Sequence, residues 1–357
     1  MRLGPIARAT SLAFLAAPLV AQTPSPPGRL VDVGGQRLHV NCTGTGSPTV
    51  IFESGTGDAS TIWALVQPRV SAFTRACSYD RAGYAWSDPG RLPRTFAQLS
   101  LELHTALCRA NVAPPYVLVG QSYGGLVVRG FAERYPDDVA GMVLVDAAPE
   151  DHRAVYGGQP HRIRDEAKGR NSPPPRIELG TDILARAKTV KVSELPTSLP
   201  APLDRLPADA QSILRWAQTL PVQSIAREAE MEWSPEEAQR MHDARLRNRA
   251  SLGNLPLAVL ARGDGDFDSG MSISADSLER ERRALQRDLA RLSTRGTIDF
   301  VPGVGHNIHV EAPRVVIDAI RRITTTARAG ATARPTPRRS VRSTTPSDSS
   351  SRRTRCT

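Results

Sequence analysis

The hexapeptide Gly120-Gln121-Ser122-Tyr123-Gly124-Gly125 places the tightest constraint on how this 357-residue chain can fold. An apolar run at residues 116–119 precedes it, and an amphipathic stretch at residues 126–135 follows it. Glycines on both sides of a serine permit the strained turn between a strand and a helix that exposes the hydroxyl at the end of a sheet. The bare G-x-S-x-G pattern is common, but the flanking strand and helix patterns are not. Ser122 is therefore predicted to be a catalytic nucleophile rather than a structural serine.

The amino-terminal segment has the composition of an export signal. Two arginines precede a short apolar stretch at residues 11–21, and several prolines follow it. The stretch is about half as long as a membrane-spanning helix requires, which favours a secretory signal. We predict a signal peptide over residues 1–21, then a linker over residues 22–29, and export to the periplasm or the extracellular space. A disordered or membrane-anchored amino terminus is the alternative.

The carboxyl-terminal segment, residues 328–357, is predicted to be a disordered basic tail. It contains eight arginines, one aspartate and hardly any large apolar side chain, so it cannot bury enough surface to fold. This tail carries most of the formal net charge of +10, and the rest of the chain is close to neutral. No nucleic-acid-binding motif or stacking aromatic accompanies it, so no nucleic-acid partner is expected.

The four cysteines are informative about the cellular compartment of the protein, and they do not indicate a metal site. No C-x-x-C or H-E-x-x-H pattern is present, so no metal site is predicted. Cys42 and Cys77 occupy corresponding places in two expected strands, and export would permit a disulfide. We predict that these two residues pair.

Strands and helices alternate over residues 30–146, which predicts a parallel sheet covered on both faces. A hairpin is expected from residues 29–33 and 36–42, joined by two glycines. Further strands are expected at residues 49–52, 76–79, 116–119 and 141–145. Catalytic groups should gather at the carboxyl ends of such strands.

The pattern changes over residues 147–253, which are rich in proline, arginine and glutamate and show no clear strand. An insertion of this length is too long for a plain loop, so we predict a helical cap, with one helix beginning at Pro235. The core resumes over residues 254–327, with strands at 255–261 and 297–301 and a last helix at 313–327.

Together these features resemble the α/β-hydrolase fold over nearly all of residues 30–327. The resemblance rests on the serine turn, a glycine-rich turn at residues 55–57, the segment 79–88 and the late Gly305-His306. It is strongest to the single-domain family of esterases, proline iminopeptidases, epoxide hydrolases and dehalogenases. It implies an α/β fold with a mostly parallel eight-stranded sheet, helices on both faces and a helical cap after the sixth strand.

By this resemblance and by chemistry, Ser122 is the nucleophile and His306 is its base. A serine hydroxyl needs a neighbouring base to attack a carbonyl at neutral pH. Of seven histidines, His306 alone follows a strand and a Gly-Val-Gly turn near the end of the domain, as the order Ser, acid, His requires. His309 is expected on the surface or in a supporting position.

The acid of the triad has two main candidates. Asp266 best matches the Gly-x-x-Asp placement of the family and is preferred. Asp146, at the end of the preceding strand, is the alternative position used by some relatives. Asp264 and Asp268, in the same aspartate-rich loop as Asp266, complete the set.

The resemblance assigns the oxyanion hole to the backbone N–H groups of Thr56 and Tyr123. The chain departs from the family pattern here, because Ser54-Gly55 stands where most members have His-Gly. Main-chain donors can survive that change, but the support around them, including the role of Glu53, is open.

A serine at this turn excludes the alkyl-enzyme chemistry of epoxide hydrolases and dehalogenases, which use an aspartate. We predict a carboxylesterase-like serine hydrolase that cleaves a small-molecule ester through an acyl-enzyme, with no cofactor. One alternative is a proline iminopeptidase-like serine aminopeptidase, and another is a non-catalytic ligand-binding protein on the same fold. The aminopeptidase would need a carboxylate cluster in the cap, which five glutamates could supply: Glu228, Glu230, Glu232, Glu236 and Glu237. Four cap residues could line an acyl pocket or belong to the core: Trp216, Met231, Trp233 and Met241.

Overall fold

The computed structural model describes residues 23–332, except for 170–178, 193–195, 197, 264 and 266–270. The expected signal peptide and the tail beyond residue 332 therefore lie outside the described residues. In the part that is described, no helix has the length and apolar character needed to span a bilayer.

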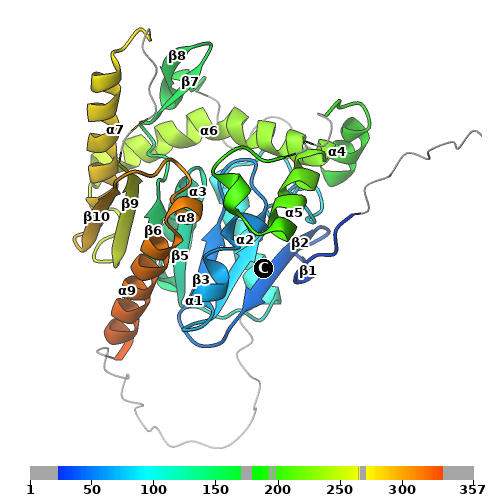
Figure 1. The fold of residues 1–357 in the computed structure, drawn as a ribbon, viewed down its shortest axis with the longest axis horizontal. Helices are drawn as coiled ribbons and strands as arrows, with labels where there is room; N and C mark the ends of the chain where they lie inside the picture. Colours follow the sequence, from blue (N-terminus) through cyan, green and yellow to red (C-terminus); the bar gives the residue numbers. More distant parts are fainter. Residues whose placement is uncertain are drawn as a thin grey trace, which may run out of the picture.

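An eight-stranded sheet in the order β1-β2-β4-β3-β5-β6-β9-β10 forms the centre of the molecule (Figure 1). In this sheet β2 runs antiparallel to both of its neighbours, β1 and β4. The other strands run parallel to one another, in the order β4, β3, β5, β6, β9 and β10. The strands span β1 Arg29–Asp32, β2 Arg37–Thr43, β3 Thr49–Glu53, β4 Ala76–Tyr79, β5 Tyr116–Gln121, β6 Val139–Val145, β9 Leu257–Arg262 and β10 Gly296–Val301. The expected hairpin at the start of the chain is confirmed by the pairing of β1 with β2.

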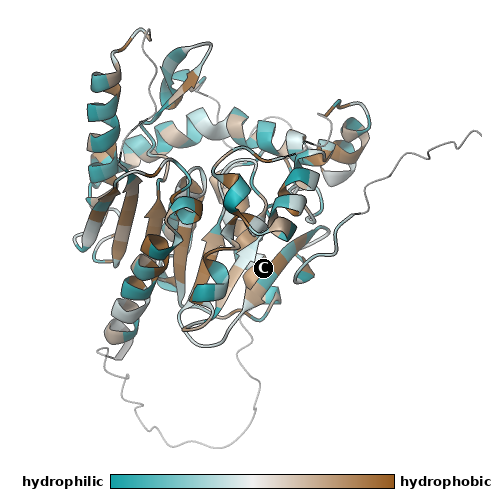
Figure 2. Cartoon of the chain, in the orientation of Figure 1, coloured by the Kyte–Doolittle hydropathy of each residue, from teal (hydrophilic) through white to brown (hydrophobic). Residues whose placement is uncertain are grey.

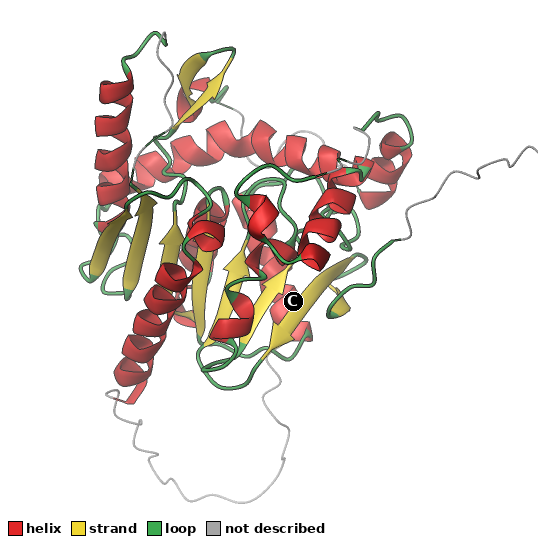
Figure 3. Cartoon of the chain, in the orientation of Figure 1, coloured by secondary structure: helices red, strands yellow, loops and turns green. Residues whose placement is uncertain are grey.

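Helices cover both faces of the sheet (Figure 3), which is why its central strands are apolar throughout. One face packs against α1 Gln67–Val70, α8 Ile308–Glu311 and α9 Pro313–Thr332. The other face packs against α2 Phe96–Arg109, α3 Gly124–Arg134 and α7 Ala275–Ala290. Figure 2 shows the result as brown strands between helices with teal outer faces. The predicted α/β fold class is confirmed. The last helix continues to Thr332, five residues into the segment expected to be tail.

The described residues between β6 and β9 include the α-helices α4 Gly180–Ala187, α5 Ala208–Gln218 and α6 Pro221–Arg247. Figure 1 shows α6 crossing above the ends of the strands. The expectation of no strand here was wrong, because β7 Arg153–Tyr156 and β8 Gln159–Arg162 form a small antiparallel hairpin. The expected helix start at Pro235 was also wrong. Pro235 lies inside α6, which tolerates the loss of one backbone hydrogen bond because it packs on both sides of the proline.

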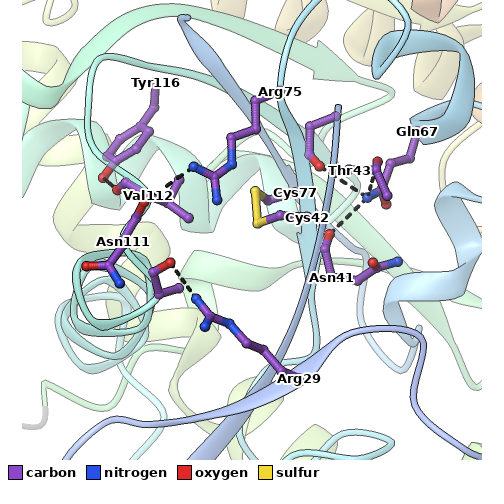
Figure 4. The surroundings of a disulfide bond; sticks show 12 residues. Arg29, Asn41, Cys42, Thr43, Gln67, Arg75, Cys77, Asn111, Val112 and Tyr116 are labelled. Atoms are coloured by element: carbon purple, nitrogen blue, oxygen red, sulfur yellow. Dashed lines mark hydrogen bonds between the residues drawn. A yellow bond between two sulfur atoms is a disulfide. The ribbon is translucent and has the colours of Figure 1, made fainter. Parts of the chain in front are cut away.

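A disulfide joins Cys42 to Cys77 across the antiparallel pair β2 and β4 (Figure 4). The two residues are direct partners in the register, and their Cα atoms lie 4.0 Å apart. Gln67 lies beside them and donates hydrogen bonds to the carbonyl oxygen of Asn41 and to Oγ1 of Thr43. The predicted cysteine pair is therefore confirmed, and it fastens the outer hairpin to the parallel part of the sheet.

Replacing both cysteines by alanine should lower the free energy of unfolding by about 3 to 4 kcal/mol, because the bond closes a loop between residues 35 positions apart. Urea unfolding followed by circular dichroism measures this loss. Unchanged unfolding midpoints in the double variant and in the reduced wild type would contradict it.

Candidate active site

Ser122 stands in the left-handed region of backbone space, with φ at +53°, between the end of β5 and the start of α3. Its N–H donates to the carbonyl oxygen of Val145 at the end of β6, at 3.2 Å. The turn also needs glycine at position 124. A Cβ on Gly124 would lie 2.6 Å from the carbonyl oxygen of Glu53 and 2.7 Å from that of Ser54, both at the end of β3. The sequence thus folds here into a strained turn that presses against the neighbouring strand.

His306 follows β10 and lies against Asp146, which follows β6. Its Nδ1 is 2.6 Å from Oδ2 of Asp146, so the ring donates from Nδ1 and leaves Nε2 as the acceptor. The second carboxylate oxygen, Oδ1, accepts from the backbone N–H of Arg262 at 3.0 Å. Asp146 is buried and has a φ of +40°, so its carboxylate is held in one direction.

The structure thus brings Asp146, the alternative acid, into contact with the predicted base. Asp266, the preferred acid, and Asp264 and Asp268 lie outside the described residues. Burial alone would raise the pKa of Asp146. The hydrogen bond from His306 and the charges of His306 and Arg262 outweigh burial and hold this pKa below its ordinary value. Asp146 is accordingly a stable carboxylate partner for an imidazole.

A cavity of about 210 Å³ brings Ser122, Asp146 and His306 together. Its other wall comes from α7, through Leu278 and Gln286. Gln121, next to the predicted nucleophile, places its Nε2 3.3 Å from Nε2 of His306, the atom that would accept a proton. Three residues far apart in the chain therefore share one hollow at the carboxyl edge of the sheet.

The loop after β3, at residues 54–56, lies directly beside Ser122. A Cβ on Gly55 would be 3.3 Å from Cβ of Ser122 and would collide with Oε1 of Gln121. Within the described chain, the backbone N–H groups of Thr56 and Tyr123 donate to no protein acceptor. Two unpaired donors beside a nucleophile are what an oxyanion hole requires.

A buried ion cluster supports this loop, and the sequence analysis did not predict it as part of the site. Arg81, after β4, donates to Oε1 of Glu53 at 2.6 Å and to Oε1 of Glu230 on α6 at 2.7 Å. Tyr79 donates to the other oxygen of Glu53, and Tyr84 donates to Oε2 of Glu230 at 2.7 Å. The only sequence signals were the Asp80-Arg81 segment after the fourth strand and the unexplained Glu53.

Asp58 is a second feature that the sequence analysis missed. Its carboxylate is half-buried beside Gly55 and faces Arg81, His306 and Arg227. Removal from water raises the pKa of Asp58 to about 6, against the opposing electrostatic effect of these three residues. The group is therefore partly protonated near neutral pH.

His309 is fully buried and packs on Trp63, with ring centroids 4.8 Å apart, so of its two expected places, on the surface or in a supporting position, the surface is wrong. Burial, together with the charge of His306, lowers the pKa of His309 to about 3. Among the cap residues considered for an acyl pocket, Trp233 and Met241 are buried in the core, whereas Met231 is exposed near Oγ1 of Thr56. No cluster of three metal-ligating side chains occurs among the described residues.

The profile of an alpha/beta hydrolase family matches residues 50–319. The chain belongs to this family. A fungal member described as an AB hydrolase superfamily protein, from Gibberella zeae, is 24% identical over 299 residues, covering 77% of this chain and 86% of the relative. An uncharacterized protein of Bacillus subtilis is 36% identical over 108 residues, covering 30% of this chain and 43% of the relative. The chain spans less than half the length of several other curated relatives that it matches.

Solved structures agree on the fold. A thermophilic esterase from Thermogutta terrifontis superposes with a TM-score of 0.54 at 20% sequence identity, over 82% of this chain and 94% of the esterase. This likeness shows the fold, and it agrees with the membership of the chain in the alpha/beta hydrolase family.

Ser122→Gly should be more stable than Ser122→Ala by about 1 kcal/mol, because glycine adopts a positive φ without the steric cost that a Cβ carries. Both variants lack the hydroxyl, so the comparison isolates the backbone. Chemical unfolding of the two variants measures the difference, and equal stability would contradict a strained turn.

His309→Phe should make the free energy of unfolding depend less on pH on the acid side of neutrality. The folded-state pKa of His309 is depressed to about 3, so its contribution is complete above the unfolded pKa of about 6.5 and is lost as the pH falls. Between pH 7.5 and 5.5 the wild type should lose about 1.4 kcal/mol more than the variant. Urea unfolding at both pH values tests this, and parallel losses would refute it.

Proposed function

We propose that this protein is a serine carboxylesterase in which Ser122 is the nucleophile, His306 the general base and Asp146 the acid. The contact of 2.6 Å between Nδ1 of His306 and Oδ2 of Asp146, in the cavity that holds Ser122, carries the proposal. The same contact favours Asp146 over Asp266 as the acid.

In the proposed reaction, Oγ of Ser122 attacks the ester carbonyl and Nε2 of His306 takes the hydroxyl proton. The carbonyl π electrons move to oxygen, and the N–H groups of Thr56 and Tyr123 receive the resulting oxyanion. Asp146 holds the imidazole in the required tautomer and stabilises the imidazolium. The electron pair on the oxyanion then re-forms the carbonyl, the bond from carbon to the alcohol oxygen breaks, and the imidazolium of His306 protonates the departing alcohol, which leaves the acyl-enzyme. A water molecule that gives its proton to His306 attacks the acyl-enzyme and releases the acid and Ser122 by the same steps.

Burial of the acid supports turnover rather than mere ligand binding. The positive φ angles of Ser122 and Asp146 cost stability that a binding protein would not need, and a buried carboxylate paired to a histidine beside that serine is typical of a catalytic site. A non-catalytic protein on this fold is thereby disfavoured.

The aminopeptidase is the second candidate, and Asp58 is the observation that favours it. A carboxylate beside the loop at residues 54–56 could receive a substrate ammonium. The cap glutamates argue the other way. Glu230 is held by Arg81 and Tyr84, and Glu237 accepts from the N–H of Phe96 and pairs with Arg240.

Export of the protein is proposed together with this activity. The disulfide between Cys42 and Cys77 supports it, because such bonds persist in oxidising compartments such as the periplasm.

The proposal is tested by intact-protein mass after incubation with a fluorophosphonate. The wild type should gain one adduct, and Ser122→Ala should gain none. Asp146→Asn should lower kcat on p-nitrophenyl butyrate by about 10³- to 10⁴-fold, because the wrong tautomer of His306 is then favoured. Asp266→Asn serves as the matched control and should retain activity.

An unlabelled, folded wild type would contradict the proposal, and a larger loss in Asp266→Asn than in Asp146→Asn would reassign the acid. Hydrolysis of proline 2-naphthylamide but not of short esters, with the activity lost in Asp58→Asn, would move the aminopeptidase to first place.

A further inference from the structure

Arg81 is a buried cation that contacts the loop beside Ser122 through that loop's carbonyl groups. Its side chain is 2% exposed. Nη1 donates to the carbonyl oxygen of Ser54 at 2.7 Å, and Nη2 donates to that of Gly55 at 2.9 Å. The guanidinium thus binds two successive carbonyl groups from one side of the loop.

Because the peptide bond is planar, these contacts also determine the direction of the Thr56 N–H. In a trans peptide unit the C=O and the following N–H point in opposite directions. Because the carbonyl of Gly55 points at Arg81, the N–H of Thr56 must point away from Arg81. A Cβ on Gly55 would lie 3.3 Å from Cβ of Ser122, so this N–H belongs to a loop that passes directly beside Ser122.

The long cap helix α6 holds Arg81 in this position. Glu230 binds the guanidinium with both oxygens, Oε1 to Nε at 2.7 Å and Oε2 to Nη2 at 3.1 Å. The same helix contacts the loop twice more, because Nε2 of Gln223 donates to the carbonyl oxygen of Gly57 at 3.1 Å and Met231 meets Oγ1 of Thr56. A planar fork suits this arrangement, since a lysine ammonium cannot serve two carbonyls and a bidentate carboxylate together.

We infer that Arg81 is a positioning residue that sets the direction of the Thr56 N–H, and that Glu230 makes the oxyanion hole depend on the seating of α6. The inference rests on the proposed serine-esterase function. In the step concerned, a bond forms between Oγ of Ser122 and the carbonyl carbon, the π pair moves to oxygen, and the proton goes to His306. The Thr56 N–H acts only on the oxygen that becomes charged, so the positioning residues act on the transition state and not on ground-state binding.

The test compares Arg81→Lys, Glu230→Gln and the double variant with the wild type on p-nitrophenyl butyrate. Arg81→Lys should lower kcat by about 10- to 100-fold with KM within about twofold, since an oxyanion donor is misdirected rather than removed. Glu230→Gln should lower kcat by about tenfold. The double variant should be no slower than Arg81→Lys alone, because Glu230 acts through Arg81.

A second readout uses an aliphatic trifluoromethyl ketone, which forms a tetrahedral oxyanion on the serine. Its inhibition constant should rise in proportion to the fall in kcat/KM across the variants. Arg94→Lys is the matched control, because Arg94 is an equally buried arginine that binds both oxygens of Glu102 at 2.8 and 2.9 Å and donates to none of the loop carbonyls. The Arg94→Lys variant should be less stable than the wild type, while its kcat and its inhibition constant stay unchanged.

Wild-type kcat in a folded Arg81→Lys variant would overturn the inference, as would additive losses in the double variant or a change confined to KM. A kcat loss in Arg94→Lys equal to that in Arg81→Lys would overturn it too, by assigning the effect to general destabilisation. A wild type with neither ester turnover nor a fluorophosphonate adduct would instead refute the proposed function.

Discussion

The left-handed backbone conformation of Ser122 is held by a hydrogen bond to the neighbouring strand, β6. The residue that follows β6, Asp146, has a left-handed conformation too. Ser122 donates its N–H to the carbonyl of Val145, the last residue of β6, and Asp146 donates its N–H to the carbonyl of Leu260 in β9. Each residue has a positive φ that costs a non-glycine residue of order 1 to 3 kcal/mol. The strained end of each strand is thus held by its neighbour. The parallel register of β5, β6 and β9 fixes both the proposed nucleophile and the proposed acid.

On the other side of Ser122, the proposed nucleophile, a buried charge supports the loop at residues 54–56. The proposed oxyanion hole requires that the N–H of Thr56 stay free of protein acceptors, so ordinary backbone pairing cannot hold this part of the loop. The Arg81 guanidinium holds it by the carbonyl groups instead and stays charged in the interior because Glu53 and Glu230 surround it. Burial raises the pKa of Glu53, and Arg81 opposes that rise. Ser54-Gly55 carries no histidine side chain, and the loop is held instead by Arg81, which follows β4.

Local patterns were enough to predict the serine turn, the opening hairpin, the parallel sheet and the cysteine pair, because glycine placement and alternating apolar residues report on near neighbours. The choice of acid was not available locally. Asp146 and the aspartates near residue 266 both follow strands in the sequence, and the contact of Asp146 with His306 depends on the order of β6, β9 and β10 in the sheet, which no local pattern gives. The Arg81 cluster could not be predicted from local patterns either, because Glu230 lies 149 positions after Arg81 in the chain. The prediction that a helix begins at Pro235 was wrong because tertiary contacts on both sides of this residue override the local tendency of proline to begin a helix.

The anchoring of α6 also bears on how a substrate approaches. One half of the helix is bound to the core through Glu230 and Arg81, and the other through Arg245, which pairs with Glu150 and Asp151 after β6. Lifting α6 would expose buried ion pairs at either end and strip the loop at residues 54–56 of its support. The cavity that contains Ser122 lies instead between β6 and α7, lined by Leu278 and Gln286. The described residues that line this cavity include none from α6, so a substrate that occupies it displaces no side chain of the helix that orders the proposed oxyanion hole.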